Sequence, residues 1–286
     1  MKTVRLLYPE YASGGLPTYY LGAKLLEQIV PANPDQKTLQ VAVTPPSDAL
    51  HTLEDGIQDK AKVVSEITDA QRQLQVENPE RVIKLGGNCM VSFAPFDYLH
   101  GQYPDMGLLW TDAHPDASTP ADGYPCAHAM VLGSLLGDGA KAISALRQNP
   151  PFAPERLMYV GLQDLHDYQK AYLDQKGVHY EVNADWSTRL ESIQAFVSQF
   201  KHLAAHFDID VLDERYFHDT YFANLDLVGD GAHGGRMRLE TLAKILATVE
   251  ANKANTKVVG FTIAEYLPHD AYRLHQLFNH LTVFRD

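Results

Sequence analysis

Two short stretches of the chain carry side chains of the kind that bind metal ions and move protons. In "GLLWTDAHPDAST", Asp112, His114 and Asp116 occupy alternate positions where an apolar run ends. In "HLAAHFDID", Asp208 and Asp210 follow a second apolar run. Carboxylates that face one another in a partly buried cleft repel strongly unless cations neutralise them, and oxygen ligands with an imidazole suit a divalent ion such as Mn²⁺. These stretches therefore predict a divalent-metal site.

Two other apolar runs also end in residues that could do chemistry. "RVIKLGG" leads into Asn88 and Cys89, and "VVGFTIA" leads into Glu265. Taken alone, an acidic stretch of this kind is more often a polar turn or a helix cap than a ligand set. Two acidic clusters at the ends of separate buried strands favour a metal site, because ligands bind at the carboxyl ends of strands in open parallel sheets. We expect these side chains to meet at one edge of a sheet.

Short apolar runs alternate along the chain with longer amphipathic segments. The runs lack polar alternation and are rich in β-branched and aromatic residues, which is typical of strands buried on both faces. The predicted strands span 4–9, 39–44, 81–87, 106–112, 156–162, 202–210 and 257–265. The predicted helices span 17–29, 57–77, 165–176, 188–200, 238–251 and 269–283. This alternation predicts an α/β protein with a mostly parallel sheet and helices on both sides.

The domain organisation is expected to be simple. No internal repeat and no Ser/Gly linker interrupts the sequence, so we expect a single domain over residues 1–286. The segment 213–236 lacks clear periodicity and is expected to be a functional loop. The buried face of the helix over 57–77 is expected from apolar residues at three- and four-residue steps, namely Ile57, Ala61, Val64 and Ile67.

Composition excludes several classes of partner. The net charge of −12 argues against a nucleic-acid ligand, because phosphate binding needs a basic surface. No apolar run approaches the ~20 residues that span a bilayer, and the N-terminus does not resemble a secretory signal. Two cysteines, Cys89 and Cys126, cannot form a disulfide framework, which fits a reducing compartment. We therefore expect a cytoplasmic enzyme that binds neither nucleic acid nor membrane.

The order of these motifs resembles the arginase–agmatinase (ureohydrolase) superfamily. That family carries a GGDH motif, a DAHxD motif, a DxDxxD motif and a late Glu, and this chain has "GGNC", "DAHPD", "DIDVLD" and Glu265 in the same order over about residues 81 to 268. The resemblance implies a three-layer α/β/α fold around a mostly parallel sheet of about eight strands. It also implies a binuclear manganese centre that hydrolyses C–N bonds in linear guanidines or amidines. We expect a small guanidino or amidino substrate and a homo-oligomer.

The resemblance also implies a ligand set for two ions. Asp112 and Asp208 would bridge the two ions, while His114 and Asp210 would complete the ligands of one of them. The ligands implied for the second ion are Asp116 and Cys89.

Other residues would act on the substrate. Glu265 matches the carboxylate that grips the guanidinium group, and His128 matches a mobile histidine that exchanges protons with solvent. Asp116 or Asp210 would relay a proton to the leaving nitrogen. His128 has an alternative interpretation as an ordinary histidine at a helix start.

Cys89 departs from the family pattern, which has His at this point. A thiolate is a poor ligand for Mn²⁺ and a better one for Zn²⁺ or Fe²⁺, so the ion beside Cys89 is expected to be weakly held or to be one of those metals. A Cys89→His variant is accordingly expected to bind manganese more tightly. Cys89 could also remain a neutral thiol or be a small packing residue. A branch of the superfamily that includes a hydroxyarginine hydrolase is similar in having Cys here.

The residues that would hold the rest of the substrate differ as well. Ser118 and His166 stand where arginases place an Asn and an Asp that contact an amino acid, so plain arginine is not the expected substrate. The alternatives are a formiminoglutamase-like or N-hydroxyarginine-like hydrolase, or a non-catalytic arginase-fold protein with a weakened metal site. The chain keeps every other ligand of the family pattern, which favours an enzyme.

Overall fold

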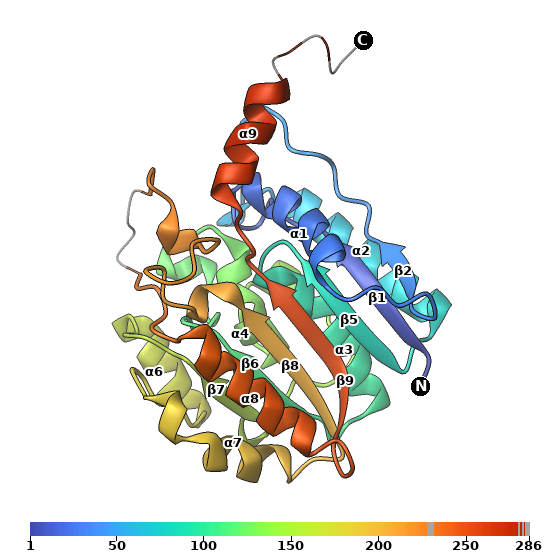
Figure 1. Cartoon of the computed structure of the whole chain (residues 1–286), viewed down its shortest axis with the longest axis vertical. Helices are drawn as coiled ribbons and strands as arrows, with labels where there is room; N and C mark the ends of the chain where they lie inside the picture. The colour runs from blue at the N-terminus through green and yellow to red at the C-terminus, as the bar shows by residue number, and fades with distance from the viewer. Residues whose placement is uncertain (228–231, 280, 282, 284–286) are drawn as a thin grey trace.

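Seven parallel strands form the central sheet of the protein, whose computed structural model describes residues 1–227, 232–279, 281 and 283 (Figure 1). Their order across the sheet is β2-β1-β5-β9-β8-β6-β7. The strands are β1 (Thr3–Tyr8), β2 (Lys37–Gln40), β5 (Arg81–Gly86), β6 (Gly107–Thr111), β7 (Leu157–Val160), β8 (His202–Asp208) and β9 (Lys257–Ala264). The predicted parallel sheet is confirmed, with seven strands in the described chain where about eight were expected.

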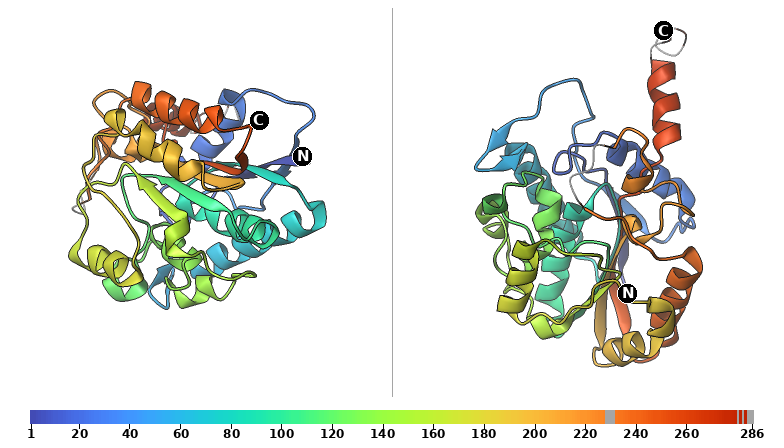
Figure 2. Two further views of the ribbon diagram at one scale, coloured as in Figure 1. Left: turned by 90° about the horizontal axis from the view of Figure 1, so that it is seen from below. Right: turned by 90° about the vertical axis from the view of Figure 1, so that its left-hand side faces the viewer.

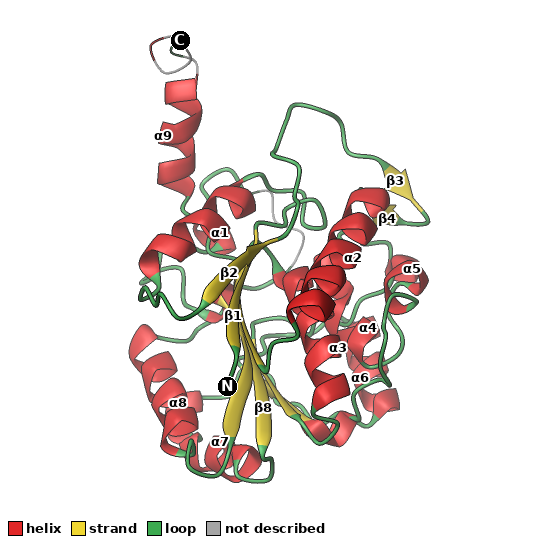
Figure 3. Cartoon of the chain, turned by 90° about the vertical axis from the view of Figure 1, so that its right-hand side faces the viewer, coloured by secondary structure: helices red, strands yellow, loops and turns green. Residues whose placement is uncertain are grey.

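Helices cover both faces of this sheet. They are α1 (Thr18–Ile29), α2 (Lys60–Glu77), α3 (Phe93–Gln102), α4 (Val131–Leu135), α5 (Lys141–Ser144), α6 (Asp167–Lys176), α7 (Leu190–Val197), α8 (Leu239–Ala251) and α9 (His269–Asn279). Viewed along the sheet, α2, α3, α4 and α6 lie on one side, and α1, α7 and α8 lie on the other (Figure 3). The view from below shows the same three layers, and α9 projects from the body (Figure 2). The predicted three-layer α/β/α arrangement is confirmed.

The centre of the sheet is apolar because both of its faces are covered. All five residues of β6, "GLLWT", are buried, as predicted for a strand without polar alternation. Trp110 of this strand is among the largest fully buried side chains of the described chain. None of the described helices is long and apolar enough to cross a membrane.

The start of α2 differs from the prediction. Residues 53–58 form a small antiparallel hairpin, β3 (Leu53–Glu54) and β4 (Ile57–Gln58), joined by Asp55 and Gly56 in left-handed conformations. Asp-Gly is a strong signal for such a two-residue turn. The prediction instead assigned Ile57 to the helix, because it lies four residues before the apolar Ala61. Ala61 is therefore exposed and Val64 only half-buried. The apolar residues on the buried face of α2 are Val63, Ile67, Ala70 and Leu74.

One further helix was not predicted, and two predicted segments lie partly outside the described chain. Helix α3 was not predicted, because most of its residues are buried and its sequence shows no polar face of helical period. Helix α9 ends at Asn279, and residues 280, 282 and 284–286 lie outside the described part of the chain. The segment 213–236 contains a short 3-10 helix, Tyr221–Ala223, and its residues 228–231 are likewise outside the description.

The strand order brings the chemically interesting strand ends together. Strands β5, β9, β8 and β6 are adjacent in the sheet although they are far apart in sequence. Since all of them run parallel, their carboxyl ends meet at one edge. These four ends carry Cys89, Glu265, Asp208 and Asp112 respectively.

Candidate metal centre

One cavity of about 350 Å³ gathers all ten residues singled out from the sequence. It opens at the carboxyl ends of the four adjacent strands. Its lining includes Cys89, Asp112, His114, Asp116, Ser118, His128, His166, Asp208, Asp210 and Glu265. The structure thus brings together every predicted site residue.

The first group of potential ligands consists of Asp112, His114 and Asp210. His114 Nδ1 lies 2.8 Å from Asp210 Oδ2 and 3.6 Å from Asp112 Oδ1. The backbone of His114 donates to Asp112 Oδ1 at 2.6 Å, which folds the "DAH" turn back over the strand end. One ligand atom from each residue lies within 4.8 Å of the others, which is close enough to share an ion.

The second group consists of Cys89, Asp112, Asp116 and a residue that was not predicted, His206. Again one ligand atom from each residue lies within 4.8 Å of the others. Asp112 therefore belongs to both groups. A carboxylate shared by two ligand groups is the arrangement expected of a residue that bridges two ions.

Asp208 and Glu265 close the cluster around Cys89. The Cys89 thiol donates to Asp208 Oδ2 at 2.6 Å and lies 3.8 Å from Glu265 Oε1. The hydroxyl group of Tyr19 donates to Glu265 Oε2 at 3.1 Å. Asp208 Oδ1 accepts from the backbone of Asp210 at 2.7 Å, so the turn after β8 is held by one of its own candidate ligands.

Two of the acidic residues adopt backbone conformations that side chains disfavour. The φ angles are +49° at Asp116 and +62° at Glu265. A left-handed conformation is uncommon for residues other than glycine, and such strain concentrates at functional sites. At Asp116 the strain turns the chain so that its carbonyl accepts from Leu132 and Gly133. The fold therefore holds both carboxylates in the cavity at an energetic cost.

The electrostatics of the cluster favour the entry of positive charge. Burial, followed by the Asp210 carboxylate, raises the pKa of Asp112 to about 6. Burial and neighbouring carboxylates raise the pKa values of Asp116, Asp208 and Glu265 well above their ordinary range. Burial, followed by the Asp116 carboxylate, also raises the pKa of the Cys89 thiol. Cations bound in the cluster would favour the ionised form of each of these groups.

His114 and Asp210 form the charged pair within this cluster. Burial lowers the pKa of His114, but the Asp210 carboxylate outweighs it and holds that pKa well above its ordinary value. Burial likewise opposes ionisation of Asp210, whose pKa is nevertheless lowered by the His114 charge. A divalent ion bound here would take over the role of the imidazolium.

Two buried atoms of the cluster lack a hydrogen-bond partner within the described chain. They are Asp116 Oδ2 and His114 Nε2. An unpaired carboxylate oxygen at 4% residue exposure is costly unless it ligates an ion or a water. The donor set of carboxylates, imidazoles and one thiol fits divalent metals of the Mn²⁺, Fe²⁺ and Zn²⁺ range.

The remaining predicted residues line the outer part of the cavity. His128 Nδ1 lies 3.0 Å from the carbonyl oxygen of Ser13. Since a carbonyl only accepts, Nδ1 carries the proton in the neutral ring. Ser118 Oγ lies 3.3 Å from the hydroxyl of Tyr168, and the His166 ring stacks on Tyr168 at 5.4 Å.

Sequence reasoning missed His206, Trp110 and Tyr19. His206 lies two residues before Asp208 and therefore on the same side of β8, because side chains alternate along a strand. Trp110 Nε1 donates to Asp112 Oδ2 at 3.0 Å. His206 and Trp110 each lie two residues before a candidate ligand, so the alternation of side chains along β8 and β6 could have identified them. No sequence pattern near Tyr19 indicates that its hydroxyl group contacts Glu265.

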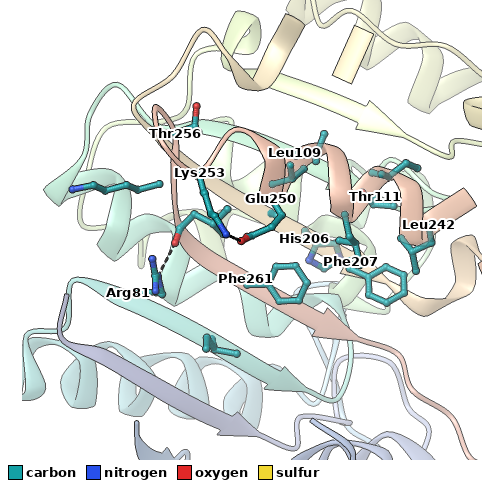
Figure 4. Close-up of a pocket in the computed structure, with 17 residues that line it drawn as sticks. Arg81, Leu109, Thr111, His206, Phe207, Leu242, Glu250, Lys253, Thr256 and Phe261 are labelled. Carbon is teal, nitrogen blue, oxygen red and sulfur yellow. Dashed lines mark hydrogen bonds and ion pairs between the residues drawn. The ribbon is translucent and has the colours of Figure 1, made fainter. Parts of the chain in front are cut away.

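A larger cavity of about 600 Å³ lies beneath α8, against β6, β8 and β9 (Figure 4). Its lining is mostly apolar and includes Phe207, Leu242 and Phe261. Lys253 pairs with Glu250 at 2.6 Å at its rim. The described lining also includes Glu250 and His206, but it contains no group of carboxylates or thiols that could hold an ion.

Lys84 is a further buried polar residue that was not predicted. This β5 side chain is fully buried, its ammonium lies 3.6 Å from the ring centroid of Phe96, and it has no hydrogen-bond partner in the described chain. Burial holds the pKa of Lys84 well below its ordinary value.

Replacing Lys84 by methionine is expected to stabilise the protein by about 1–3 kcal/mol at pH 7, because it removes a buried unpaired polar group. The unfolded chain binds the lysine proton up to about pH 10.4, while the folded chain releases it at lower pH. Between the pKa of Lys84 in the folded chain and its pKa in the unfolded chain, the wild-type free energy of unfolding rises with pH. The extra stability of Lys84→Met should therefore shrink towards pH 10. Urea unfolding at pH 7 and 9.5 measures both effects.

Lys24→Met is the matched control, since Lys24 is exposed and also lies over an aromatic ring, that of Tyr20 at 4.2 Å. This control should change stability little at either pH. A less stable Lys84→Met protein at both pH values would show that the cation over Phe96 stabilises the fold.

The fold and the cluster define an α/β protein with a candidate divalent-metal centre at the carboxyl edge of its sheet. Comparison with known proteins gives the same class. The model of the Arginase family matches residues 33–273. The chain is 26% identical over 179 residues to an arginase of Bacillus caldovelox, covering 58% of this chain and 60% of that protein. It is also 26% identical over 186 residues to an agmatinase of Halalkalibacterium halodurans, covering 65% and 55%.

The solved arginase of Entamoeba histolytica, in complex with L-ornithine, has a similar fold. Its TM-score is 0.76 at 19% identity, with 93% of this chain and 91% of that chain covered. The curated relatives are matched over less than two thirds of their length. The chain belongs to the arginase family, and the predicted family resemblance is confirmed.

Proposed function

We propose that this protein is a metal-dependent hydrolase that cleaves a C–N bond of a linear guanidino or amidino compound. The observation that carries the proposal is the pair of ligand groups that share Asp112, with the Glu265 carboxylate in the same cavity. The family membership and the names of the arginase and agmatinase relatives support this reaction class.

Two ions, manganese in the first instance, would be held by the predicted ligands. His114 and Asp210 would belong to one position, Cys89 and Asp116 to the other, and Asp112 and Asp208 would contribute to both. Divalent ions held there would lower the pKa of a coordinated water towards neutrality and so supply a nucleophile. The thiol makes the second position softer, so Zn²⁺ or Fe²⁺ could occupy it in place of Mn²⁺.

The Glu265 carboxylate would bind the cationic head of the substrate. Its left-handed backbone and the hydrogen bond from Tyr19 fix the carboxylate next to the ligand groups. A carboxylate can accept two parallel N–H groups from a guanidinium or amidinium. Ser118 and His166, at the outer part of the cavity, would contact the remainder of the substrate. Neither carries a fixed negative charge, so a free α-ammonium group would find no carboxylate at those two positions.

Proton transfer would be divided among three residues. Asp116 and Asp210 lie within the ligand groups and would pass a proton to the leaving nitrogen. His128 lies further out and donates its Nδ1 proton to the Ser13 carbonyl. This position suits a histidine that exchanges protons between the cavity and solvent.

The proposal extends to assembly and compartment. The projecting helix α9 exposes Leu274, Leu277 and Phe278, each at 46% or more. Their three- and four-residue spacing forms one apolar face, which supports a homo-oligomer. The acidic net charge and the few cysteines support a cytoplasmic location without a nucleic-acid or membrane partner.

The decisive experiment measures metal content first and activity second. Protein purified without added metal should contain divalent ions, and loading with Mn²⁺ should bring it to two per chain. A screen of guanidino acids, guanidino amines, N-hydroxyguanidines and formimino compounds should then release urea or ammonia from at least one class. A protein that binds two ions yet hydrolyses nothing in the panel would favour a non-catalytic member of the family.

His128→Ala is expected to lower kcat about 100-fold while the metal content stays at the wild-type level, because a proton-transfer residue is not a ligand. The control is His179→Ala, which replaces an exposed histidine outside the cavity and should leave kcat unchanged. Loss of one ion from His128→Ala would instead make this residue a ligand.

A further inference from the structure

His206 occupies a position that the family pattern does not explain. It lies within β8, two residues before Asp208, and is 1% exposed. Its Nε2 lies 3.5 Å from Cys89 Sγ and 3.9 Å from Asp112 Oδ2. This nitrogen therefore adjoins two of the side chains that would hold the second ion.

The ring of His206 is fixed on two sides. It stacks on the indole of Trp110 at 3.7 Å with an interplanar angle of 5°. Its Nδ1 lies 2.9 Å from Ser92 Oγ, which in turn lies 2.8 Å from Thr262 Oγ1. An imidazole with one nitrogen held by a polar partner and the other aimed at ligand groups has the usual arrangement of a metal-binding histidine.

The segment that carries Cys89 also orients His206. Cys89 and Ser92 are the two ends of one 3-10 helix, Cys89–Ser92, so thiol and hydroxyl are set by the same turn of backbone. The thiol faces one ring nitrogen and the hydroxyl holds the other. Trp110, which covers the ring face, donates to Asp112 at the same time.

The spacing suits a shared ion. Sulfur at about 2.3 Å and nitrogen at about 2.05 Å from a tetrahedral ion lie about 3.6 Å apart. The observed separation of Sγ and Nε2 is 3.5 Å. An ordinary thiol–imidazole hydrogen bond has the same length, and metal affinities distinguish the two arrangements.

We propose that His206 is a nitrogen ligand of the ion beside Cys89 and Asp116, replacing from β8 the imidazole that the family pattern places at position 89. The inference deepens the proposed function and rests on it. A nitrogen and a sulfur beside carboxylates form a softer donor set than carboxylates with imidazole alone, and this set favours Zn²⁺ over Mn²⁺ at that position. The tighter manganese binding expected of Cys89→His must then be revised, because the His206 ring already fills the space.

The test is a double-mutant cycle of His206→Ser and Cys89→His in the full-length protein, with Mn²⁺ and Zn²⁺ affinities as the readout. His206→Ser should weaken one of the two ions about 10–100-fold and leave the other unchanged. Cys89→His alone should not tighten Mn²⁺ binding, because its ring would collide with His206. The double variant should bind Mn²⁺ at least as tightly as the wild type, since one imidazole then has room.

A spectroscopic measurement and a control variant distinguish the loss of a metal ligand from a loss of packing. Nitrogen couplings in pulsed EPR of the Mn²⁺-loaded protein should fall from two imidazoles to one in His206→Ser. His206→Gln keeps much of the side-chain volume and should show the same loss. His100→Ser is the control, because His100 is buried and stacks on Phe152 at 4.1 Å outside the cluster. It should lose stability but no metal affinity.

Unchanged affinities in a folded His206→Ser protein would overturn the inference, as would additive effects in the cycle. These outcomes are independent of the proposed hydrolysis. A protein that hydrolyses a guanidino compound with His206 irrelevant to metal binding refutes only this inference. A cycle that behaves as expected in a protein without hydrolase activity refutes only the proposed function.

Discussion

Asp208→Ala is expected to remove both metal ions and to lower hydrolysis by several orders of magnitude, because water near neutral pH is a poor nucleophile without the ions. Asp208 contacts the Cys89 thiol through Oδ2 and caps the Asp210 turn through Oδ1. Asp112→Ala should have the same effect, since Asp112 belongs to both ligand groups. Metal analysis of each purified variant and urea release measure the two losses.

The Asp208 variant should lose metal without losing its fold. Burial and neighbouring carboxylates raise the pKa of Asp208, and relief of this cost should offset the lost hydrogen bond from the Asp210 backbone, so the melting temperature of the metal-free protein should change little. Asp97→Ala serves as the control, because Asp97 is equally buried and accepts two backbone N–H groups outside the cluster. That variant should be less stable and keep its metals. Two ions per chain in Asp208→Ala would exclude a bridging role.

The strand pattern predicted most of what positions the candidate site. Buried parallel strands lack polar alternation, so β6 and β8 were recognisable, and the polar residues at their ends pointed to one edge. The sequence could not reveal that β5, β9, β8 and β6 are neighbours, because the order of strands depends on long-range packing. It is this order that brings Cys89 and Glu265, 176 residues apart, within 3.8 Å of each other.

The elements that were missed have physical causes. A continuous apolar segment such as α3 has no helical period, and the spacing of Ile57 concealed an Asp-Gly hairpin. His206 was not predicted because the family motif places its imidazole at position 89 and has no histidine within the strand before Asp208. A histidine within an otherwise apolar strand, two residues before a candidate ligand, was the local signal.

Gly87→Ala is expected to destabilise the protein by about 2–4 kcal/mol and to weaken metal binding, because an added methyl group would overlap neighbouring backbone. A Cβ at this position would lie 1.7 Å from the carbonyl oxygen of Glu10. The conformation of Gly87 is not left-handed, so the cost comes from crowding and not from φ. Gly87 donates to the Tyr8 carbonyl at 2.9 Å and accepts from the backbone of Glu265 at 2.6 Å.

These contacts join the ends of β1, β5 and β9 directly before Cys89, so relief of the clash must move either the Glu10 loop or the residues that follow Gly87 in the site. Gly133→Ala is the matched control, since Gly133 is buried in α4 and an added Cβ there would meet its nearest neighbour, Ala117, at an ordinary 3.4 Å. Urea unfolding and metal titration compare the two variants. A Gly87→Ala protein as stable as Gly133→Ala, with unchanged metal affinity, would show that the Glu10 loop yields without cost and that Gly87 does not position the centre.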